Sequence, residues 1–373
     1  MDFTEHRMPN TKRYFSGKQL LHPLLWWASG LYGSGMRFRF WLYRRHLLTT
    51  RGLPLKVISI GNLAAGGTGK TPHAALVARY LQKKGIKTAV LSRGYRGTKV
   101  KEGAVISDTG SLRGTLEEGG EEPYWLAQKL PGIPVVIGKN RYRSGMLCFQ
   151  KWQTEWVILD DGFQHLNLKR EIDILLLPGH QPLGSGRLLP LGFLREPIEE
   201  MRRADIILIT HAERLDFSQR EDMAGEIRSR VPAIPVFFSE HKPKVLWSYP
   251  NKKEIPLSEL AGKQVVGFCG LASPESFIFS LKQLQADPVN LVEFPDHHYY
   301  REKDKRSLEI LCRSLKNNWL VTTEKDALKL GKWEPTDLQI LVLGIEVEIE
   351  GDAFWELLDL KIGQEARGLR QKV

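Results

Sequence analysis

The segment "GNLAAGGTGKTP", from Gly61 to Pro72, has the residue types of a phosphate-binding turn. Its glycines allow backbone N–H groups to converge on phosphate oxygens, and the positive end of a following helix adds to the attraction. In this pattern the lysine reaches the β- and γ-phosphates and the threonine hydroxyl binds Mg²⁺. The strict G-x-x-x-x-G-K-[ST] pattern has glycine where this chain has Ala64, which is tolerable if Ala64 has a negative φ. We therefore predict a nucleotide site formed by Gly66, Gly67, Thr68, Gly69, Lys70 and Thr71.

A second motif, "WVILDDGFQH", supplies two adjacent carboxylates. Four apolar residues, 156–159, predict a buried strand, and Asp160 and Asp161 follow at its end. Ligands bind at this edge of open parallel sheets, so one aspartate is placed to act as the Walker B ligand of Mg²⁺, normally through a metal-bound water. The alternative is a simple turn before Gly162, where aspartate is also favoured. Beside the glycine-rich turn, the metal-site interpretation is the stronger one.

Two further acidic and histidine motifs are candidates for proton transfer. "GGEEP" places Glu121 and Glu122 after two glycines, and "FPDHHYY" places Asp296, His297 and His298 at the end of a predicted strand. A carboxylate paired with histidine is a suitable proton acceptor for an alcohol nucleophile. The alternatives are a solvated acidic pair and a structural histidine pair. Adjacent histidines seldom turn to one ion, so a zinc site is not predicted.

The loop "GSGRLLPLGFLREP" contributes Arg187, Arg195 and Glu196. An arginine in such a glycine- and proline-rich loop can clamp a phosphate through paired hydrogen bonds. An ordinary loop with solvated charges explains the same residues equally well.

The surrounding elements predict an α/β fold. "LKVISIGN" (55–62) is a buried strand and "TPHAALVARYLQKKG" has helical spacing, so strand, turn and helix follow in the order of a P-loop; a chance glycine-rich turn is the alternative. Further apolar strands indicate a P-loop NTPase-like parallel sheet with helices on both faces, and a pattern restarting at Gln264 indicates a smaller C-terminal α/β lobe. We predict an N-terminal membrane-associated segment at 1–50, a P-loop kinase domain at 51–238, a hinge or linker at 239–263 and the C-terminal lobe at 264–373. The two lobes would leave a substrate cleft between them.

The N-terminal segment indicates contact with a membrane. "LLHPLLWWASGLYGSGM", from Leu20 to Met36, has no formal charge, and as a helix it is about 26 Å long, close to the roughly 30 Å of a bilayer core. "RFRFWLYRRHLL" follows, in which arginines alternate with aromatic residues, as at an anionic cytoplasmic interface. A single spanning helix and a helix lying in the interface both fit. A buried helix of the globular part is the alternative.

Composition sets the class of protein. Hydrophobic residues make up 42% of the chain and charged residues 26%, as in a globular protein with a substantial core. The net charge is +11, and residues 1–55, with nine Lys or Arg against two acidic residues, carry seven of these charges. Nucleic-acid binders spread basic residues over a folded face, so no nucleic-acid partner is predicted. The three distant cysteines favour a reducing compartment, and no pattern indicates an oligomeric state.

Taken together, the motifs resemble those of the tetraacyldisaccharide 4′-kinases, the lipid A 4′-kinases of Gram-negative bacteria. The resemblance runs from the N-terminal apolar segment to about Leu330, with the motifs in the same order. P-loops of that family also have the form xxGGxGKT, so Ala64 fits. The motifs that carry the resemblance are "GNLAAGGTGKTP", "LSRGYRG", "GEEP", "DDGFQH", "GRLLPLGFLREP", "FCGLASPESF", "FPDHH" and "TTEKDALKL".

The resemblance implies transfer of the γ-phosphoryl group of ATP to the 4′-hydroxyl of a tetraacylated, 1-phosphorylated glucosamine disaccharide. It implies a location at the cytoplasmic face of the bacterial inner membrane, where the acyl chains of this lipid substrate remain. Lys70 and Thr71 would keep the roles given above, and Asp160 and Asp161 match the acidic pair that organises Mg²⁺ and ATP. Three more residues match active-site or substrate-cleft positions of the family: Arg141, Gln164 and Glu196.

The base is the position at which this chain departs from the family. The family's proposed base is an aspartate in G-D-E-P, helped by the histidine after the aspartate of the D-H-x motif. The corresponding residues here are Glu121 and His297, and the additional methylene of glutamate moves the carboxylate. Glu122 or His298 is an alternative participant.

Two other functions share some of these features. One is a membrane-associated ATPase switch with a KGGxGKT P-loop, but such proteins have lysine where this chain has Ala65, and they need no acceptor cleft. The other is a non-enzymatic membrane adaptor with a degenerate nucleotide site. The intact set of Lys70, Thr71, Asp160 and Asp161 argues against the adaptor.

Overall fold

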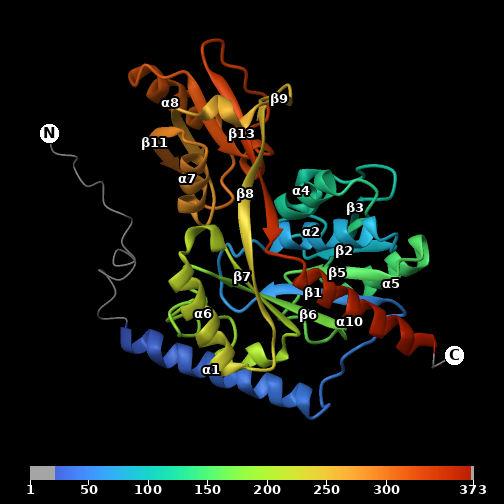
Figure 1. Ribbon diagram of the computed structural model, residues 1–373. Helices are drawn as coiled ribbons and strands as arrows, with labels where there is room; N and C mark the ends of the chain where they lie inside the picture. Colours follow the sequence, from blue (N-terminus) through green and yellow to red (C-terminus); the bar gives the residue numbers. More distant parts are fainter. Residues whose placement is uncertain (1–21, 371–373) are drawn as a thin grey trace.

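The computed structural model describes residues 22–370, and it has the predicted α/β architecture (Figure 1). Residues 1–21, which belong to the predicted membrane-associated segment, lie outside the described residues. The strands form one continuous path in the order β11-β10-β12-β13-β8-β7-β6-β1-β5-β2-β4-β3, with β9 added beside β8. Two lobes share this path, a larger one around β1 and a smaller one around β10.

The larger lobe contains the predicted parallel sheet. Its neighbouring strands are parallel except for the edge pair β3 and β4. β1 lies between β5 and β6, so the turn after β1 and the acidic end of β5 meet at one edge of the sheet. The strands are β1 (Lys56–Asn62), β2 (Thr88–Ser92), β3 (Ala104–Ser107), β4 (Val135–Ile137), β5 (Trp156–Asp160), β6 (Ile172–Pro178), β7 (Ile206–Thr210) and β8 (Val236–Ser248).

Helices cover both faces of this sheet. Alternate strand residues point to opposite faces, so Ile58 and Ile60 pack with α2 on one side while Val57 packs near α5 on the other. Both sets are fully buried, which explains the nearly continuous apolar runs in the sequence. The helices of the lobe are α2 (Lys70–Lys83), α3 (Leu116–Gly119), α4 (Glu121–Lys129), α5 (Arg141–Trp152) and α6 (Phe217–Arg230), with 3₁₀ turns η3 (Ile198–Arg203) and η4 (Ala212–Arg214).

The smaller lobe repeats the alternation of strands and helices. Its parallel strands β11, β10, β12 and β13 enclose a separate core that includes Phe268 and Phe277. Its elements are β9 (Lys253–Ile255), η5 (Leu257–Leu260), β10 (Gln264–Cys269), α7 (Pro274–Gln283), β11 (Asp287–Glu293), α8 (Glu302–Ser314), β12 (Trp319–Thr323), α9 (Glu324–Ala327) and β13 (Gln339–Ile349).

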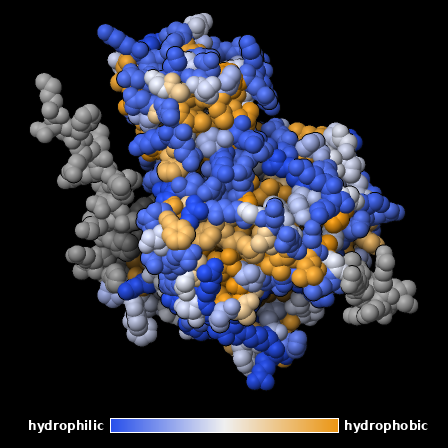
Figure 2. All heavy atoms as spheres, in the orientation of Figure 1, coloured by the Kyte–Doolittle hydropathy of each residue, from blue (hydrophilic) through white to orange (hydrophobic). Residues whose placement is uncertain are grey.

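The segment 239–263, predicted as a hinge or linker, contains regular structure. β8 pairs in parallel with β7 through residues 236–238, and it then continues beside antiparallel β13 through residues 239–248. Pro243 is accommodated because the register shifts between Gly344 and Ile345, and prolines in sheets are tolerated at such bulges. On the face shown in Figure 2, hydrophilic side chains gather between the lobes. The two long strands β8 and β13 therefore connect the lobes where the sequence pattern predicted a hinge or linker.

The last helix, α10 (Ala353–Arg370), differs from the predicted division of the chain. Residues 264–373 were predicted as one lobe, but α10 returns to the larger lobe and packs beside α2 (Figure 1). Phe354 is fully buried there, and Trp355 stacks on Tyr80 with ring centroids 4.2 Å apart. Apolar contact therefore places α10 with the nucleotide-binding half.

The first helix, α1 (His22–Arg44), lies along the larger lobe (Figure 1). One side is docked, with Phe40 and Ser29 buried, whereas the opposite side exposes large apolar side chains. Within residues 22–370, no helix has the length and apolarity needed to cross a bilayer. The exposed apolar residues of α1 are Leu24, Trp26, Trp27, Leu31, Phe38 and Trp41.

Candidate active site

The predicted phosphate-binding turn lies between β1 and α2. Gly66 and Gly69 have φ values of 131° and 74°, which favour glycine, and Gly69 is the N-cap of α2 without a side-chain cap. Thr68 is buried, and its hydroxyl accepts a hydrogen bond of 2.9 Å from the Asn62 side chain. Ala64 does not have a positive φ, which explains why a glycine is not needed at this position. The first N–H groups of α2 thus remain available for an anion.

Asp160 and Thr71 lie together at the start of α2. The Thr71 hydroxyl is 3.4 Å from each carboxylate oxygen of Asp160, and the Ser92 hydroxyl is 3.2 Å from one of them. Burial raises the pKa of Asp160 to about 7, and the charges of Glu122 and Asp161 act in the same direction. Burial disfavours the ionised carboxylate, and a divalent cation would stabilise it, so this hydroxyl–carboxylate pair suits such a cation.

Asp161 points to different partners. Its backbone is left-handed, with φ 55°, and its carboxylate accepts hydrogen bonds of 3.1 and 3.0 Å from Arg195. Lys70 Nζ lies 3.8 Å from the same carboxylate and 3.5 Å from the Gly66 carbonyl oxygen. Burial acts to raise the pKa of Asp161, but the charges of Lys70 and Arg195 outweigh it, so the pKa is lowered. The adjacent aspartates therefore have opposite electrostatic environments.

Glu121 and His297 meet across the two lobes. Glu121 is the first residue of α4, after Gly120 with φ 82°, and His297 follows β11 with a φ of 64°. His297 Nδ1 lies 3.0 Å from a Glu121 carboxylate oxygen. This hydrogen bond is the main reason why the pKa of His297 is raised. The structure thus brings the two residues predicted as base and helper into direct contact.

Lys329 is a member of this cluster that the sequence did not reveal. Its side chain is fully buried, 3.4 Å from Glu121 and 3.2 Å from Asp326. Burial acts to raise the pKa of Glu121, yet the His297 hydrogen bond and the Lys329 charge together lower it. The only sequence signal was a lysine within "TTEKDALKL", where helix-surface and buried lysines look alike.

The alternative participants have other partners. Glu122 lies 3.6 Å from Lys325, and His298 contacts Asp304 at 3.0 Å while stacking on Phe294. Glu122 nevertheless influences the candidate metal site, since its charge contributes to the raised pKa of Asp160. The geometry therefore favours Glu121 and His297 as the proton-transfer pair.

Arg141, Gln164 and Glu196 occupy three different environments. Arg141 is buried at the start of α5, where it hydrogen-bonds the Gly138 carbonyl; burial lowers its pKa to about 10, and the charges of Asp160 and Asp161 oppose the shift. Gln164 donates a 2.8 Å hydrogen bond to the Asn62 carbonyl at the end of β1.

Glu196 is a predicted site residue that lies in a buried ion pair and not at the open phosphate turn. It is completely buried in an ion pair with Arg203, and burial raises its pKa to about 7. Its second oxygen has no hydrogen-bond partner among residues 22–370. These contacts place it in the packing between η3 and the larger lobe, and a role in substrate binding remains a prediction.

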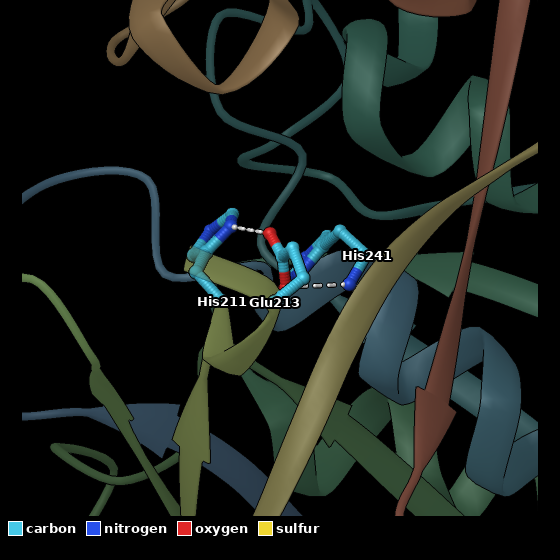
Figure 3. A group of neighbouring side chains, drawn as sticks. All are labelled: His211, Glu213 and His241. Atoms are coloured by element: carbon cyan, nitrogen blue, oxygen red, sulfur yellow. Dashed lines mark hydrogen bonds and ion pairs between the residues drawn. The ribbon is translucent and has the colours of Figure 1, made fainter. Parts of the chain in front are cut away.

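A histidine cluster lies beside the turn, with His211 and Glu213 just after β7 and His241 within β8 (Figure 3). His211 Nδ1 is 3.3 Å from Glu213, whose other oxygen accepts a 2.9 Å hydrogen bond from the His241 backbone N–H. The two imidazole rings stack, with centroids 3.9 Å apart and planes within 8° of parallel. Lone pairs that lie in two parallel ring planes do not converge on one ion, so this arrangement is not a preformed metal site. Instead, His241 and His73 fill the space beside Gly69, where a Cβ atom would lie 2.6 Å from His241 Nε2.

The sheet, the phosphate turn and the Thr71–Asp160 pair define a P-loop phosphoryl-transfer protein, with a second lobe that supplies part of the site. A sequence profile of the family described as tetraacyldisaccharide-1-P 4′-kinase matches residues 21–363. The chain therefore belongs to the tetraacyldisaccharide-1-P 4′-kinase family.

Individual relatives agree with this assignment. The tetraacyldisaccharide 4′-kinase of Desulfatibacillum aliphaticivorans is 37% identical over 332 residues, covering 87% of this chain and 88% of that protein. The tetraacyldisaccharide 4′-kinase of Syntrophus aciditrophicus is 38% identical over 339 residues, covering 89% and 90%. The crystal structure of LpxK from Aquifex aeolicus in complex with ATP superimposes with a TM-score of 0.72 at 33% identity, covering 92% of this chain and 99% of that one. The family resemblance and the P-loop fold predicted from the sequence are thus confirmed.

Proposed function

We propose that this chain is an ATP-dependent lipid kinase that transfers the γ-phosphoryl group to the 4′-hydroxyl of a tetraacyldisaccharide 1-phosphate. The observation that carries the proposal is the convergence of two pairs, Thr71 with Asp160 and Glu121 with His297. The first pair suits the metal of a nucleotide and the second suits deprotonation of an alcohol. The names of the relatives supply the acceptor, a tetraacyldisaccharide.

ATP and Mg²⁺ fit the residues around the phosphate turn. The α2 N-terminus and the turn would hold the phosphates, and Lys70 would leave Asp161 to reach the β- and γ-phosphates. Thr71 and Asp160 would hold Mg²⁺, which neutralises phosphate charge when bound. Asp160 would lose its proton on cation binding, and the cation would offset the repulsion of its carboxylate from Glu122 and Asp161.

Glu121 would accept the proton of the 4′-hydroxyl. Its lowered pKa keeps the carboxylate ionised at neutral pH, and His297 and Lys329 hold it in place. A low pKa makes a weak base, but a loose phosphoryl-transfer transition state demands mainly alignment and a late proton transfer. Because Glu121 belongs to the larger lobe and the other two residues to the smaller one, the base is complete only when the lobes meet.

A lipid acceptor also requires a membrane-facing surface, which α1 provides. Five exposed apolar residues recur at helical spacing along one side of it: Leu24, Trp27, Leu31, Phe38 and Trp41. A cavity of about 300 Å³ lies beside this helix, with Trp26, Leu188 and Leu191 among its apolar lining and Arg37 and Arg187 among its basic lining. Apolar and cationic groups together match an acyl chain next to a phosphate.

We further propose that the protein acts at the cytoplasmic face of the bacterial inner membrane. The basic residues of α1 and the preceding segment attract anionic lipids, each by about 1 kcal/mol near the surface. ATP is available on this side, and the free buried cysteines suit a reducing compartment.

The deciding experiment supplies purified protein with Mg-ATP and a radiolabelled disaccharide 1-phosphate. A bisphosphorylated lipid is expected, and ATP consumption should depend on the lipid. Equal ATP hydrolysis with and without acceptor, and no phosphorylated lipid, would instead identify a membrane-associated ATPase switch.

A further inference from the structure

The loop 187–196 connects α1 to the phosphate site through its backbone. On one side, the Arg195 N–H donates to the Leu63 carbonyl at 2.7 Å, and the Ala65 N–H donates to the Phe193 carbonyl at 2.7 Å. These bonds attach the loop to the chain entering the P-loop. A displacement of the loop would therefore also move the backbone that enters the phosphate turn.

On the other side, the same loop is held by α1. The Tyr32 hydroxyl donates a 2.7 Å hydrogen bond to the Arg195 carbonyl, and the Ser29 hydroxyl donates a 2.9 Å bond to the Leu188 carbonyl. Close packing accompanies these bonds, since a Cβ added at Gly33 would lie 2.7 Å from Leu188. Burial and the charge of Glu196 raise the pKa of Tyr32, which keeps its hydroxyl protonated as a donor.

Arg195 carries the connection to the reacting groups. Its guanidinium holds the Asp161 carboxylate through the two hydrogen bonds described above, and Asp161 also faces Lys70. Arg195 is thus the single residue between Tyr32 and Asp161. Its carbonyl accepts the Tyr32 hydrogen bond, and its guanidinium donates to Asp161.

We propose that Tyr32 is a positioning residue for phosphoryl transfer, fixing the Arg195 backbone so that the Arg195 side chain holds Asp161 in its working orientation. The inference rests on the proposed kinase function. It gives α1 a second role, because the helix that exposes an apolar side would also hold the loop 187–196 in position beside the phosphate site. Tyr32 would act through Arg195 and not by direct contact with nucleotide or acceptor.

Tyr32→Phe removes one oxygen and keeps the ring, so the packing of α1 is preserved. Tyr43→Phe is the matched control, because it is the same change on the same helix and the Tyr43 hydroxyl has no hydrogen bond to the described residues. Removing one hydrogen bond that aligns the reacting groups should lower kcat by about threefold to tenfold. We expect this loss in Tyr32→Phe only, with the KM values for ATP and lipid within about twofold of wild type.

A double-mutant cycle with Arg195→Gln separates positioning from general stability. If Tyr32 acts through Arg195, adding Tyr32→Phe to Arg195→Gln changes kcat little further. Multiplicative losses in the double variant, or a Tyr32→Phe enzyme as fast as Tyr43→Phe, would overturn the inference while leaving the kinase function intact.

Amide hydrogen exchange tests the role of Tyr32 without the lipid acceptor. The Leu194 and Arg195 amides, bonded to Arg187 and Leu63, should exchange faster in Tyr32→Phe than in Tyr43→Phe. If wild-type protein fails to phosphorylate the lipid, the proposed function is refuted. The exchange comparison still tests whether Tyr32 positions the Arg195 backbone: unchanged exchange in Tyr32→Phe refutes this, and faster exchange supports it.

Discussion

His297 Nδ1 lies 3.0 Å from a Glu121 carboxylate oxygen, although the two residues are 176 positions apart and belong to different lobes. The contact depends on a left-handed His297 and on the glycine that precedes Glu121. Such a contact exists only in one relative placement of the lobes. The assembly of the proposed proton-transfer pair is therefore coupled to the arrangement of the strands β8 and β13 that join the lobes.

Glu121→Gln tests this pair directly. The amide keeps the shape of the side chain but cannot accept a proton, so we expect kcat to fall by roughly 10²-fold or more, with nearly unchanged affinity for ATP. Steady-state lipid phosphorylation and calorimetric ATP binding measure the two effects. Glu122→Gln is the control, and because Glu122 faces Lys325 it should lose less activity. Normal turnover of Glu121→Gln would place the base elsewhere.

Lys329→Gln tests the electrostatic support of the base. Glu121 must be ionised to accept a proton, so activity is lost as pH falls through its pKa, which Lys329 helps to keep low. Removing this cation raises the pKa, and the acidic limb of the kcat–pH profile should therefore move to higher pH. Lys332→Gln, an exposed neighbour, should leave the limb unchanged.

The fold must survive this change for the profile to be interpretable. Asp326, the other partner of Lys329, keeps hydrogen bonds from Tyr300, Gly270 and Thr323. Circular dichroism and ATP binding verify that the variant is folded. An acidic limb that coincides with that of wild type would show that Lys329 does not tune Glu121.

The pKa of about 7 at Asp160 predicts a pH-dependent affinity for Mg-ATP. Below this pH the carboxyl is protonated and must lose its proton to a cation, so affinity should fall by up to about tenfold per pH unit and level off above pH 7. Titration calorimetry at pH 6, 7 and 8 measures the slope. Asp160→Asn provides the control, because the titration of ATP itself remains while that of Asp160 is lost. Equal slopes in both proteins would contradict the assignment.

Local patterns were sufficient to predict the phosphate turn and the carboxylates. The turn, the strand ending at Asp160 and the helix after Gly69 are each encoded within about a dozen residues, so spacing alone identified them. The parallel order of the larger sheet also followed from alternating strands and helices. The Glu121–His297 contact was reached through the family resemblance, because no local pattern links the two motifs.

Long-range packing was what the sequence did not reveal. Lys329 reaches Glu121 because α9, which precedes it, packs against α4. Similarly, α10 packs on the larger lobe through Phe354. β8 has a polar and proline-containing sequence, and its pairing with the distant strand β13 makes residues 239–248 a strand. Glu196 differs in another way, since a buried pair with Arg203 gives no sequence signal that distinguishes it from an exposed loop residue.

Leu31→Glu tests the membrane-facing side of α1. Leu31 is 78% exposed in the apolar row, and placing a charge there opposes insertion into the interface and repels anionic lipids. We expect reduced flotation with vesicles containing anionic phospholipid and a raised KM for lipid presented in those vesicles, while ATP binding stays unchanged. Ile310→Glu is the matched control, because Ile310 is also exposed but lies on α8 in the smaller lobe, away from α1 (Figure 1). Equal flotation of both variants and wild type would show that this row of α1 does not contact the membrane.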